Sequence, residues 1–365
     1  MANATSAANF KIKIGDKDPE DDVKPDLQSF VVERDMFQPD MAAIVLSNQG
    51  GTWSTVKVGD PIEINVGDAA GENIYKGEVV GLEPVYKGGE KARMLIRGMN
   101  RFHRLLRYRK SVTFTDKTDQ QILSQVVGDA GLSLEWKHDK SITYKHVYQH
   151  NQTDMEFLRT RAARMGCHVW CYDKTIFVKE PNLQQTPTLK LSVVEPRGGS
   201  SGAMIKTFTP RLSSACILKK VTVRGWNPET KELIVGDHSA QDSRLGSQNA
   251  VAGSGDLGKE ETFTVDHPIW SKEEAVALAK ARLVDLSLGY ITGECEVTGQ
   301  ATGQGDLDLG MVVEIEANAE ADTKADDPFN GKYYIMGITH RFLMSKTKDG
   351  GYSTILRLAR DAQKA

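Results

Sequence analysis

A glycine-rich segment is the first place where the sequence could bind a ligand. Gly253-Ser254-Gly255-Asp256-Leu257-Gly258-Lys259 fits seven positions of a phosphate-binding loop, in which backbone N–H groups and the Lys hold phosphate. The next residue is Glu260, where the motif needs a Ser or Thr hydroxyl for magnesium. Thr262-Phe263-Thr264-Val265 then alternates like a strand, so no helix N-terminus follows to hold phosphate. We interpret the segment as an exposed loop and expect no cofactor.

Cys167 and Cys171 stand in a Cys-His-Val-Trp-Cys run that could suggest a metal site. On a strand they point to the same side but lie about 13 Å apart, too far to share one zinc ion. No second Cys or His pair stands at metal-ligand spacing, and four cysteines, at 167, 171, 216 and 295, are too few for a disulfide framework. We therefore predict no metal and reduced thiols in or near a core, in a protein that folds in a reducing cytoplasm.

The histidines and carboxylates form no recognisable catalytic group. None of the eight histidines pairs with a Ser or Cys in a nucleophile motif. Asp306 and Asp308 precede the turn at Gly310, and Asp326-Asp327-Pro328 caps a hairpin loop, as solvated turn residues do. We predict no catalytic residue, although the sequence leaves a pair of glycosidase carboxylates open.

The one dense basic cluster lies in segment 101–110. Phe102 and Tyr108 are interleaved with its cations, as nucleic-acid binding would require, but a net charge of −3 gives no general attraction to phosphate. We expect instead a strand that faces an interface, with its cations paired to carboxylates of a neighbour. The cluster comprises Arg101, His103, Arg104, Arg107, Arg109 and Lys110.

Three helices and several short strands are predicted around these residues. Each helix begins at a Ser or Thr followed three residues later by Gln or Glu, and each ends at a Gly. The starting pairs are Thr118/Gln121, Thr153/Glu156 and Ser271/Glu274, and the closing glycines are Gly131, Gly166 and Gly289. Strands are predicted at 110–115, 143–148, 168–172, 175–179 and 219–224.

The most informative feature is a pattern that occurs twice, about 250 residues apart. Each copy has a strand in which apolar residues alternate with Glu, a second strand opened by Gly, and a closing strand punctuated by Arg. The copies read 58–64, 76–81 and 92–98, then 309–315, 330–335 and 354–360, with Glu63 and Glu314 in equivalent positions. A duplicated antiparallel unit suggests pseudo-symmetry and a part that matches a ring, which favours assembly over catalysis.

The overall composition is that of a globular protein. A length of 365 residues allows two or three domains, and the chain is 39% hydrophobic and 26% charged. No apolar run approaches the roughly 18 residues of a membrane helix. The start, Met1-Ala2-Asn3-Ala4-Thr5-Ser6, has neither the basic nor the apolar part of a signal peptide. Residues 1–24 are small, polar and acidic, and we expect them to be loose.

A series of strings stands in an order and spacing that match a known family over roughly residues 25–362. They are 98–105, leading into Thr115 and the helix ending at Gly131-Leu132, then 151–158, 221–228, 274–283, 310–315, 331–335, 340–342 and 350–352. Together they resemble the phage late control protein D family, the central baseplate hub of contractile tails, and the related N-terminal half of VgrG spike proteins.

This resemblance implies a mainly β fold with an α+β insert. Two tube-like antiparallel β-barrels, related by the internal pseudo-repeat, would be joined by a smaller α+β region. We expect a flexible segment at 1–24, the first barrel at 25–110, an α+β bracing domain at 111–206 and 236–290, and the second barrel at 207–235 and 291–365.

The resemblance also implies a function without catalysis. Three chains would present six barrels in a ring and adapt a six-fold tail tube to a three-fold spike. The expected partners are two further copies of the chain, a tail tube protein, a separate spike protein and other baseplate proteins, with no membrane and no specific nucleic acid. Compared with VgrG, we expect no OB-like domain, needle or lysozyme-like segment after Ala365, so the spike would be a separate chain. We expect cytoplasmic assembly, then a place in the baseplate of a virion or injection particle.

Two other classes of function are also compatible with the sequence. One is a peptidoglycan hydrolase with β-rich wall-binding domains, and the other is a carbohydrate-binding module on a fibre. The second would need a patch of exposed aromatics, whereas aromatic residues make up only 7% of the chain and are scattered.

Overall fold

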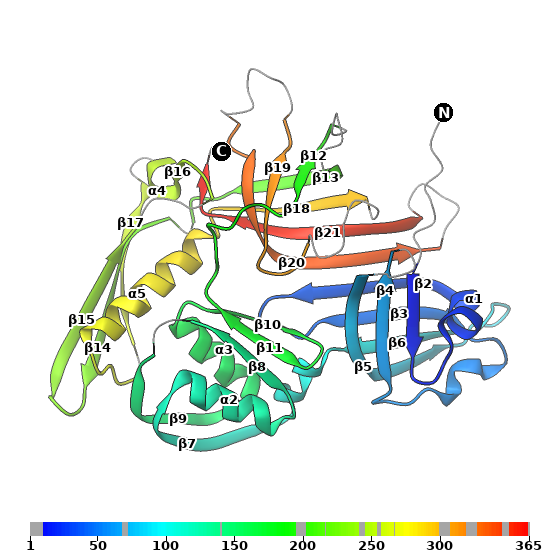
Figure 1. The fold of residues 1–365 in the computed structure, drawn as a ribbon, viewed down its shortest axis with the longest axis horizontal. Coiled ribbons are helices and arrows are strands. Elements are labelled where there is room, and N and C mark those ends of the chain that lie inside the picture. The colour runs from blue at the N-terminus through cyan, green and yellow to red at the C-terminus, as the bar shows by residue number, and fades with distance from the viewer. Residues whose placement is uncertain are drawn as a thin grey trace.

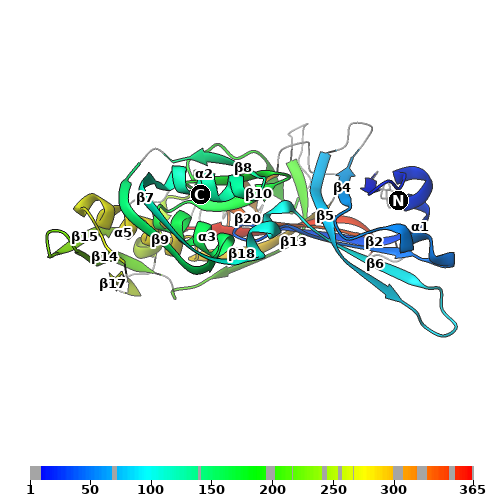
Figure 2. The same ribbon diagram turned by 90° about the horizontal axis from the view of Figure 1, so that it is seen from below.

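The structure is a computed structural model that describes residues 10–67, 72–138, 141–194, 202–215, 217–240, 245–253, 257–265, 267–298, 307–318, 327–344 and 350–363. Twelve strands form one large sheet, which runs along the molecule and folds into two barrel-like units (Figure 1). Figure 2 shows the first unit at one end of the long axis and a helix-covered small sheet at the other. The chain is therefore mainly β, as the sequence predicted.

The first unit contains six strands in the order β1-β4-β5-β6-β3-β2. Strands β1, β2 and β3 alternate between buried apolar residues and more exposed ones, because one face lines the core and the other faces out. Every ladder in this order is antiparallel. The strands are β1 (Phe10–Ile14), β2 (Leu27–Asp35), β3 (Met41–Ser47), β4 (Pro61–Val66), β5 (Glu72–Val85) and β6 (Arg93–Met99).

The second unit is a closed barrel of six strands. The order β20-β19-β12-β13-β18-β21 returns to its start because β20 also pairs with β21. The ends of this sheet thus pair with each other, although β13 pairs with β12 only at residues 202–204. The strands are β12 (Lys190–Ser192), β13 (Gly202–Leu212), β18 (Ile291–Thr298), β19 (Val312–Glu316), β20 (Gly331–Leu343) and β21 (Gly351–Arg360).

The two units repeat one strand order, as the duplicated sequence pattern predicted. β4, β5, β6 and β3 of the first correspond to β19, β20, β21 and β18 of the second, with the same antiparallel pairings. A β-bulge precedes Gly81 opposite Arg97 in one and Gly337 opposite Arg357 in the other. The sixth strands differ, because β1 is antiparallel to β4 whereas β12 is parallel to β19.

A compact α+β unit lies beside the barrels. Thr118 and Thr153 each accept a hydrogen bond from the backbone N–H three residues on, and the side chains of Gln121 and Glu156 accept one from the backbone N–H of those threonines, so two of the three predicted capping boxes are confirmed. At the third, Ser271 accepts from Glu274 N, but the Glu274 side chain accepts from Trp270 N instead of Ser271 N. Gly131 then allows the left-handed backbone (φ 72°) that follows the first of these helices. The unit comprises β7 (Arg109–Thr118), α2 (Asp119–Asp129), β8 (Ser133–Lys137), β9 (Thr143–Thr153), α3 (Asp154–Arg164), β10 (His168–Tyr172) and β11 (Thr175–Lys179).

A separate three-stranded sheet revises the expected first stretch of the second barrel. Of residues 207–235, only the β13 part lies in the barrel, whereas β14 and β15 pair with β17 in a sheet of their own under α5. Val221 and Val223 of β14 pack against Ala275 and Ala279 of that helix, and this burial draws the strands away from the barrel. The elements are β14 (Leu218–Asn227), β15 (Glu232–Ser239), β17 (Lys259–Thr264) and α5 (Lys272–Ser287).

Two other expectations are corrected in the described ranges. Within 1–24, Phe10–Ile14 is not loose but forms β1, because Ile12 and Ile14 are buried in the first core. In the stretch assigned to bracing, β12 and the start of β13 instead belong to the second barrel. Short elements complete the chain: α1 (Lys24–Asp26), β16 (Gln248–Asn249), α4 (Ala250–Gly253) and β22 (Ala362–Gln363), with helical turns at 19–23, 49–55 and 101–106.

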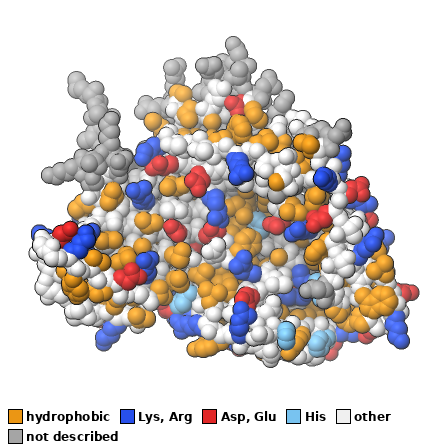
Figure 3. Space-filling view, turned by 180° about the vertical axis from the view of Figure 1, so that it is seen from behind, with side chains coloured by type: hydrophobic (Ala, Val, Ile, Leu, Met, Phe, Trp, Pro, Cys, Tyr) orange, Lys and Arg blue, Asp and Glu red, His pale blue; other side chains and the backbone are white. Residues whose placement is uncertain are grey.

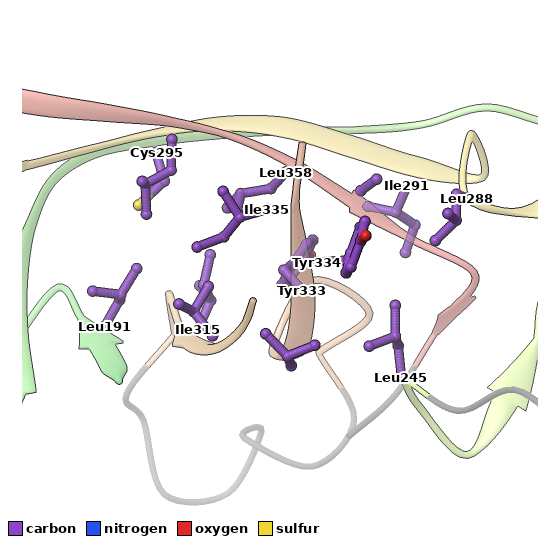
Figure 4. Packing of buried hydrophobic residues seen from close by; sticks show 14 of the residues in the cluster. Leu191, Leu245, Leu288, Ile291, Cys295, Ile315, Tyr333, Tyr334, Ile335 and Leu358 are labelled. Carbon is purple, nitrogen blue, oxygen red and sulfur yellow. The ribbon is translucent and has the colours of Figure 1, made fainter. Parts of the chain in front are cut away.

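Four apolar clusters hold these parts together, one in each barrel, one in the α+β unit and one under α5. The second barrel has the largest, in which Tyr333, Tyr334 and Ile335 of β20 meet residues of β18, β19 and β21 (Figure 4). None of the helices in the described ranges is long and apolar enough to cross a membrane.

Candidate assembly site between the two barrels

The two barrels are joined by a continuous ladder. β2 of the first pairs antiparallel with β20 of the second, from Ser29 opposite Leu343 to Asp35 opposite Gly337. On the inner face of this junction, Phe30 and Phe342 are stacked with ring centroids 5.5 Å apart, and Phe10 lies 4.5 Å from Phe342. Aromatic rings of both barrels therefore share one core, which fixes the angle between the barrels.

A buried arginine, Arg34, links the two barrels at the end of the ladder where Asp35 lies opposite Gly337. Arg34 Nη2 donates a hydrogen bond of 2.7 Å to Asp308 Oδ1 of the second barrel, and Arg34 Nε lies 3.6 Å from Asp40 Oδ2 of the first. Arg34 is 6% exposed and Asp40 3% exposed. Beside them, Arg357 Nη2 donates to Asp35 Oδ1 across the ladder. The junction therefore carries charge pairs that depend on both barrels being in place.

Burial sets the protonation of the groups around Arg34. It raises the pKa of Asp40 to about 7, against the pull of Arg34 in the other direction. It lowers the pKa of His340 to about 3, so the ring is neutral at neutral pH, with Nδ1 2.7 Å from the Tyr352 hydroxyl. Burial also lowers the pKa of Arg34, but Asp308 and Asp40 raise it above its ordinary value. Arg34 is thus a permanent cation held by carboxylates.

The α+β unit is fastened to both barrels near the same place. Phe37 N donates to Val169 O at 2.7 Å, and Asn100 Nδ2 donates to Cys171 O at 3.0 Å. On the side of the second barrel, His168 Nδ1 lies 3.0 Å from the Tyr334 hydroxyl. All three contacts on the α+β side come from strand β10, which therefore touches both barrels.

The basic cluster in segment 101–110 is paired within the chain. Arg104 Nη2 lies 2.7 Å from Glu78, Arg109 Nη2 lies 2.8 Å from Glu156, and Lys110 Nζ lies 2.7 Å from Asp154. Arg101 also forms an ion pair with Asp173. These carboxylates come from the same chain and not from a neighbouring one, and residues 101–106 form a helical turn where a strand was expected. On the face shown in Figure 3, positive and negative side chains are interspersed, unlike a phosphate-binding patch.

The cysteines behave as core residues. Cys167 and Cys171 are buried, and burial raises the pKa of both thiols, that of Cys167 to about 12. Cys295 is buried in the second barrel, and Cys216 lies outside the described residues. Within the described ranges, no three His, Cys, Asp or Glu side chains gather where a metal could bind.

The phosphate-loop segment is only partly described. Residues 254–256 lie outside the described ranges, and the structure describes only Gly253 and residues 257–259 of this segment. Lys259 begins β17, which confirms that a strand and not a helix follows. The segment therefore lacks the helix N-terminus that a phosphate-binding loop needs.

The described carboxylates named in the sequence analysis lie opposite lysines on neighbouring strands, in an ion pair or in a turn. Glu63 faces Lys76 across β4 and β5, and Glu314 faces Lys332 across β19 and β20, which confirms their equivalence. Asp308 lies before its predicted turn with its side chain 41% exposed, and Arg34 binds it as well. Asp327 Oδ1 accepts a hydrogen bond from Phe329 N in its turn, whereas Asp306 and Asp326 lie outside the described residues.

Sequence reasoning missed Arg34, Asp40 and the Phe30–Phe342 stack. One signal was available: Phe30, Val32 and Arg34 fall on the same face of a strand, so the alternation places a charge on the apolar face. A buried charge needs a partner, and the partner lies 274 residues away in the sequence.

Comparison with known proteins places the chain in a family. The sequence matches the family described as "Alg8 N-terminal domain" over residues 44–343. The chain belongs to this family. No curated protein matches it in sequence.

Solved structures share the fold of this member of the Alg8 N-terminal domain family. A tail protein from Neisseria meningitidis aligns with a TM-score of 0.70 at 14% identity, covering 97% of each chain. The 43 kDa tail protein of prophage MuSo2 from Shewanella oneidensis gives the same TM-score and identity, covering 97% of this chain and 99% of that one. An Escherichia coli protein described as a type VI secretion component similar to phage T4 tail proteins aligns at 0.60 and 12% identity, covering 97% and 79%. At these identities the likeness shows the fold.

Proposed function

We propose that the chain is the non-enzymatic hub of a contractile tail or injection particle, a homotrimeric adaptor between a six-fold tube and a three-fold spike. The observation that carries this proposal is the repeated strand order of the two barrels within one chain. Three chains with two similar barrels each give six similar surfaces for a six-fold tube. The same three chains give three identical surfaces for a spike.

Three further observations support this function. The β2–β20 ladder and the ion pair between the buried Arg34 and Asp308 hold the two barrels together, as a rigid ring would need. The proteins of similar fold are described as tail proteins and as a type VI secretion component. Of the described residues that could have carried chemistry, Cys167 and Cys171 are buried, and Asp308 and Arg104 form ion pairs within the chain.

The proposed partners follow from this arrangement. The tube side would bind a tail tube protein, the opposite side a separate spike protein, and the periphery other baseplate proteins. Assembly would take place in the cytoplasm, and the hub would then remain in the virion or injection particle. An obligate trimer of this kind needs interfaces above about 2,000 Å² per pair.

Mass measurement in solution tests this function. For the chain alone, we expect light scattering to give three times the chain mass of 40.2 kDa, and adding the spike partner should raise this mass by the mass of the spike. A chain that stays monomeric at all concentrations and does not bind the spike would contradict the proposal. A zymogram addresses the hydrolase alternative, because clearing of peptidoglycan by the purified chain would show an activity that a hub does not need.

A further inference from the structure

The pseudo-symmetry of the two barrels can be followed residue by residue. Strand β2 corresponds to β13, because each has a bulge against its neighbour, after Leu27 in one and after Ile205 in the other. Strand β5 corresponds to β20 through the bulges before Gly81 and Gly337. These bulges fix the register, so every position in one junction has a defined counterpart.

The pseudo-symmetry defines two kinds of junction between neighbouring barrels, and a single chain contains only one of them. Residues 29–35 of β2 pair with 337–343 of β20, and the counterpart would join 207–213 to 81–87. Within the described ranges both of these edges lack a partner strand. β13 pairs with β12 only at 202–204, and the β4 ladder on β5 ends at Glu78. Each chain therefore offers one unfilled edge of each kind.

We propose that edge 81–87 of one chain pairs antiparallel with edge 207–213 of a second copy, in the register of the internal junction. This inference rests on the proposed trimer, in which three such contacts alternate with three internal junctions and close the ring. In the internal junction, Gly337 lies opposite Asp35. Their counterparts, Gly81 and Ser213, would therefore lie opposite each other, and the remaining pairs follow in order along the two strands. They are Leu82–Leu212, Glu83–Arg211, Pro84–Pro210, Val85–Thr209, Tyr86–Phe208 and Lys87–Thr207.

One face of the new ladder would be entirely apolar. Leu82, Pro84 and Tyr86 alternate on one edge and meet Leu212, Pro210 and Phe208 on the other, since successive strand residues point to opposite faces. This is the face on which Phe30 and Phe342 stack in the internal junction, so Tyr86 and Phe208 would replace them. In the single chain Tyr86 is 75% exposed and Leu212 38% exposed, which leaves apolar surface for a partner to cover.

The opposite face would place unlike charges together. Glu83 lies directly across from Arg211, and directly opposed unlike charges stabilise antiparallel strands. Within the chain Glu83 already binds Arg97 at 2.5 Å, and both are about half exposed. Arg211 would join this pair and give the carboxylate a second cation. A one-residue shift would put Arg211 and Glu83 on opposite faces and lose the match.

The facing prolines limit the ladder without preventing it. Pro84 and Pro210 have no N–H, so the ladder would lack the donors of that one pair. Proline is tolerated on sheet edges because its missing N–H can face away from the strand with which it already pairs. The remaining backbone groups of the two edges would still pair, and the side chains would set one register.

Disulfide trapping tests the register. In a Cys216→Ser background, the Glu83→Cys/Arg211→Cys variant should form dimers and trimers on a non-reducing gel after mild oxidation. The remaining natural cysteines at 167, 171 and 295 are buried and should not contribute. The matched control is Val85→Cys/Arg211→Cys, whose diagonal spacing of roughly 7–8 Å should give far less cross-linking.

Charge reversal tests the pair itself. Glu83→Arg or Arg211→Glu should raise about tenfold the protein concentration at which half of the chains are assembled. The Glu83→Arg/Arg211→Glu variant should bring this concentration back to the wild-type value. A trimer that neither cross-links at 83/211 nor responds to these charges overturns the inference but leaves the proposed function standing. A wild-type chain that never assembles overturns both.

Discussion

At the scale of residues, the Arg34 cluster is the feature on which the junction depends most. Arg34 lies between Asp40 of its own barrel and Asp308 of the other, and both Arg34 and Asp40 are buried. We expect Arg34→Met to lower the free energy of unfolding by about 3–5 kcal/mol, because it leaves a buried carboxylate without its cation. Urea unfolding measures this loss. Arg93→Met, at a site 39% exposed and paired with Glu90, should change stability by less than about 0.5 kcal/mol.

Asp40 makes part of the stability depend on pH. Burial raises the pKa of Asp40 to about 7, so between its ordinary value and 7 the folded state holds a proton that the unfolded state has lost. This contribution is therefore complete at acid pH and disappears as the pH rises through 7. The stability of the wild type relative to Asp40→Asn should fall between pH 5 and pH 8 in urea unfolding. A difference that stays constant or grows over this range would contradict the assignment.

Asp308 shows why single residues were the hardest part to predict. The turn around Gly310 predicted a solvated carboxylate, and the turn is present, with Gly310 in the left-handed region (φ 80°). The partner of Asp308 is Arg34, which comes from a strand 274 residues earlier. Local sequence fixes the turn, but only the packing of the two barrels brings the cation to it.

At the scale of elements, the capping boxes of the α+β unit give a direct test of local sequence. Thr153 Oγ1 accepts a hydrogen bond from Glu156 N, and Glu156 Oε2 accepts one from Thr153 N. Thr153→Ala should cost about 1 kcal/mol in thermal or urea unfolding, because helix N–H groups lose their acceptor. Thr160→Ala, an exposed position in the same helix, should cost nothing or stabilise slightly. Equal losses at both positions would contradict a capping role.

The elements that were predicted well carry their signals locally. β10 and β11 match the predicted ranges 168–172 and 175–179, and α2 and α3 follow their capping residues. β14 was also predicted as a strand, but its assignment to the second barrel was wrong. The alternation of Val221 and Val223 shows that one face is buried, but it does not show that α5 covers that face. Strand β1 was missed because the acidic residues at 16–22 made the whole segment 1–24 read as polar and loose, although Phe10, Ile12 and Ile14 alternate as in a strand.

At the scale of the whole molecule, the cores interlock. Phe342 of the second barrel packs into the first core, and Trp170 of the α+β unit belongs to the core of the second barrel. Phe37, which follows β2, packs against both the second barrel and the α+β unit. The duplicated pattern predicted two similar units, but it could not predict which side chains pass between them. These shared side chains tie the three parts together.

This interlocking predicts that damage in one barrel loosens the other. Phe342 lies between Phe10 and Phe30, so Phe342→Ala should open a cavity in the first core although it changes the second barrel. We expect a loss of about 2 kcal/mol, less than for a fully buried Phe because Phe342 is only partly buried. Hydrogen exchange should rise in β2 and β3 as well as in β20. Leu233→Ala, at a position 59% exposed on β15, should leave exchange unchanged. Faster exchange confined to residues 312–360 would mean that the barrels are independent, and a rigid hub could not be built from them.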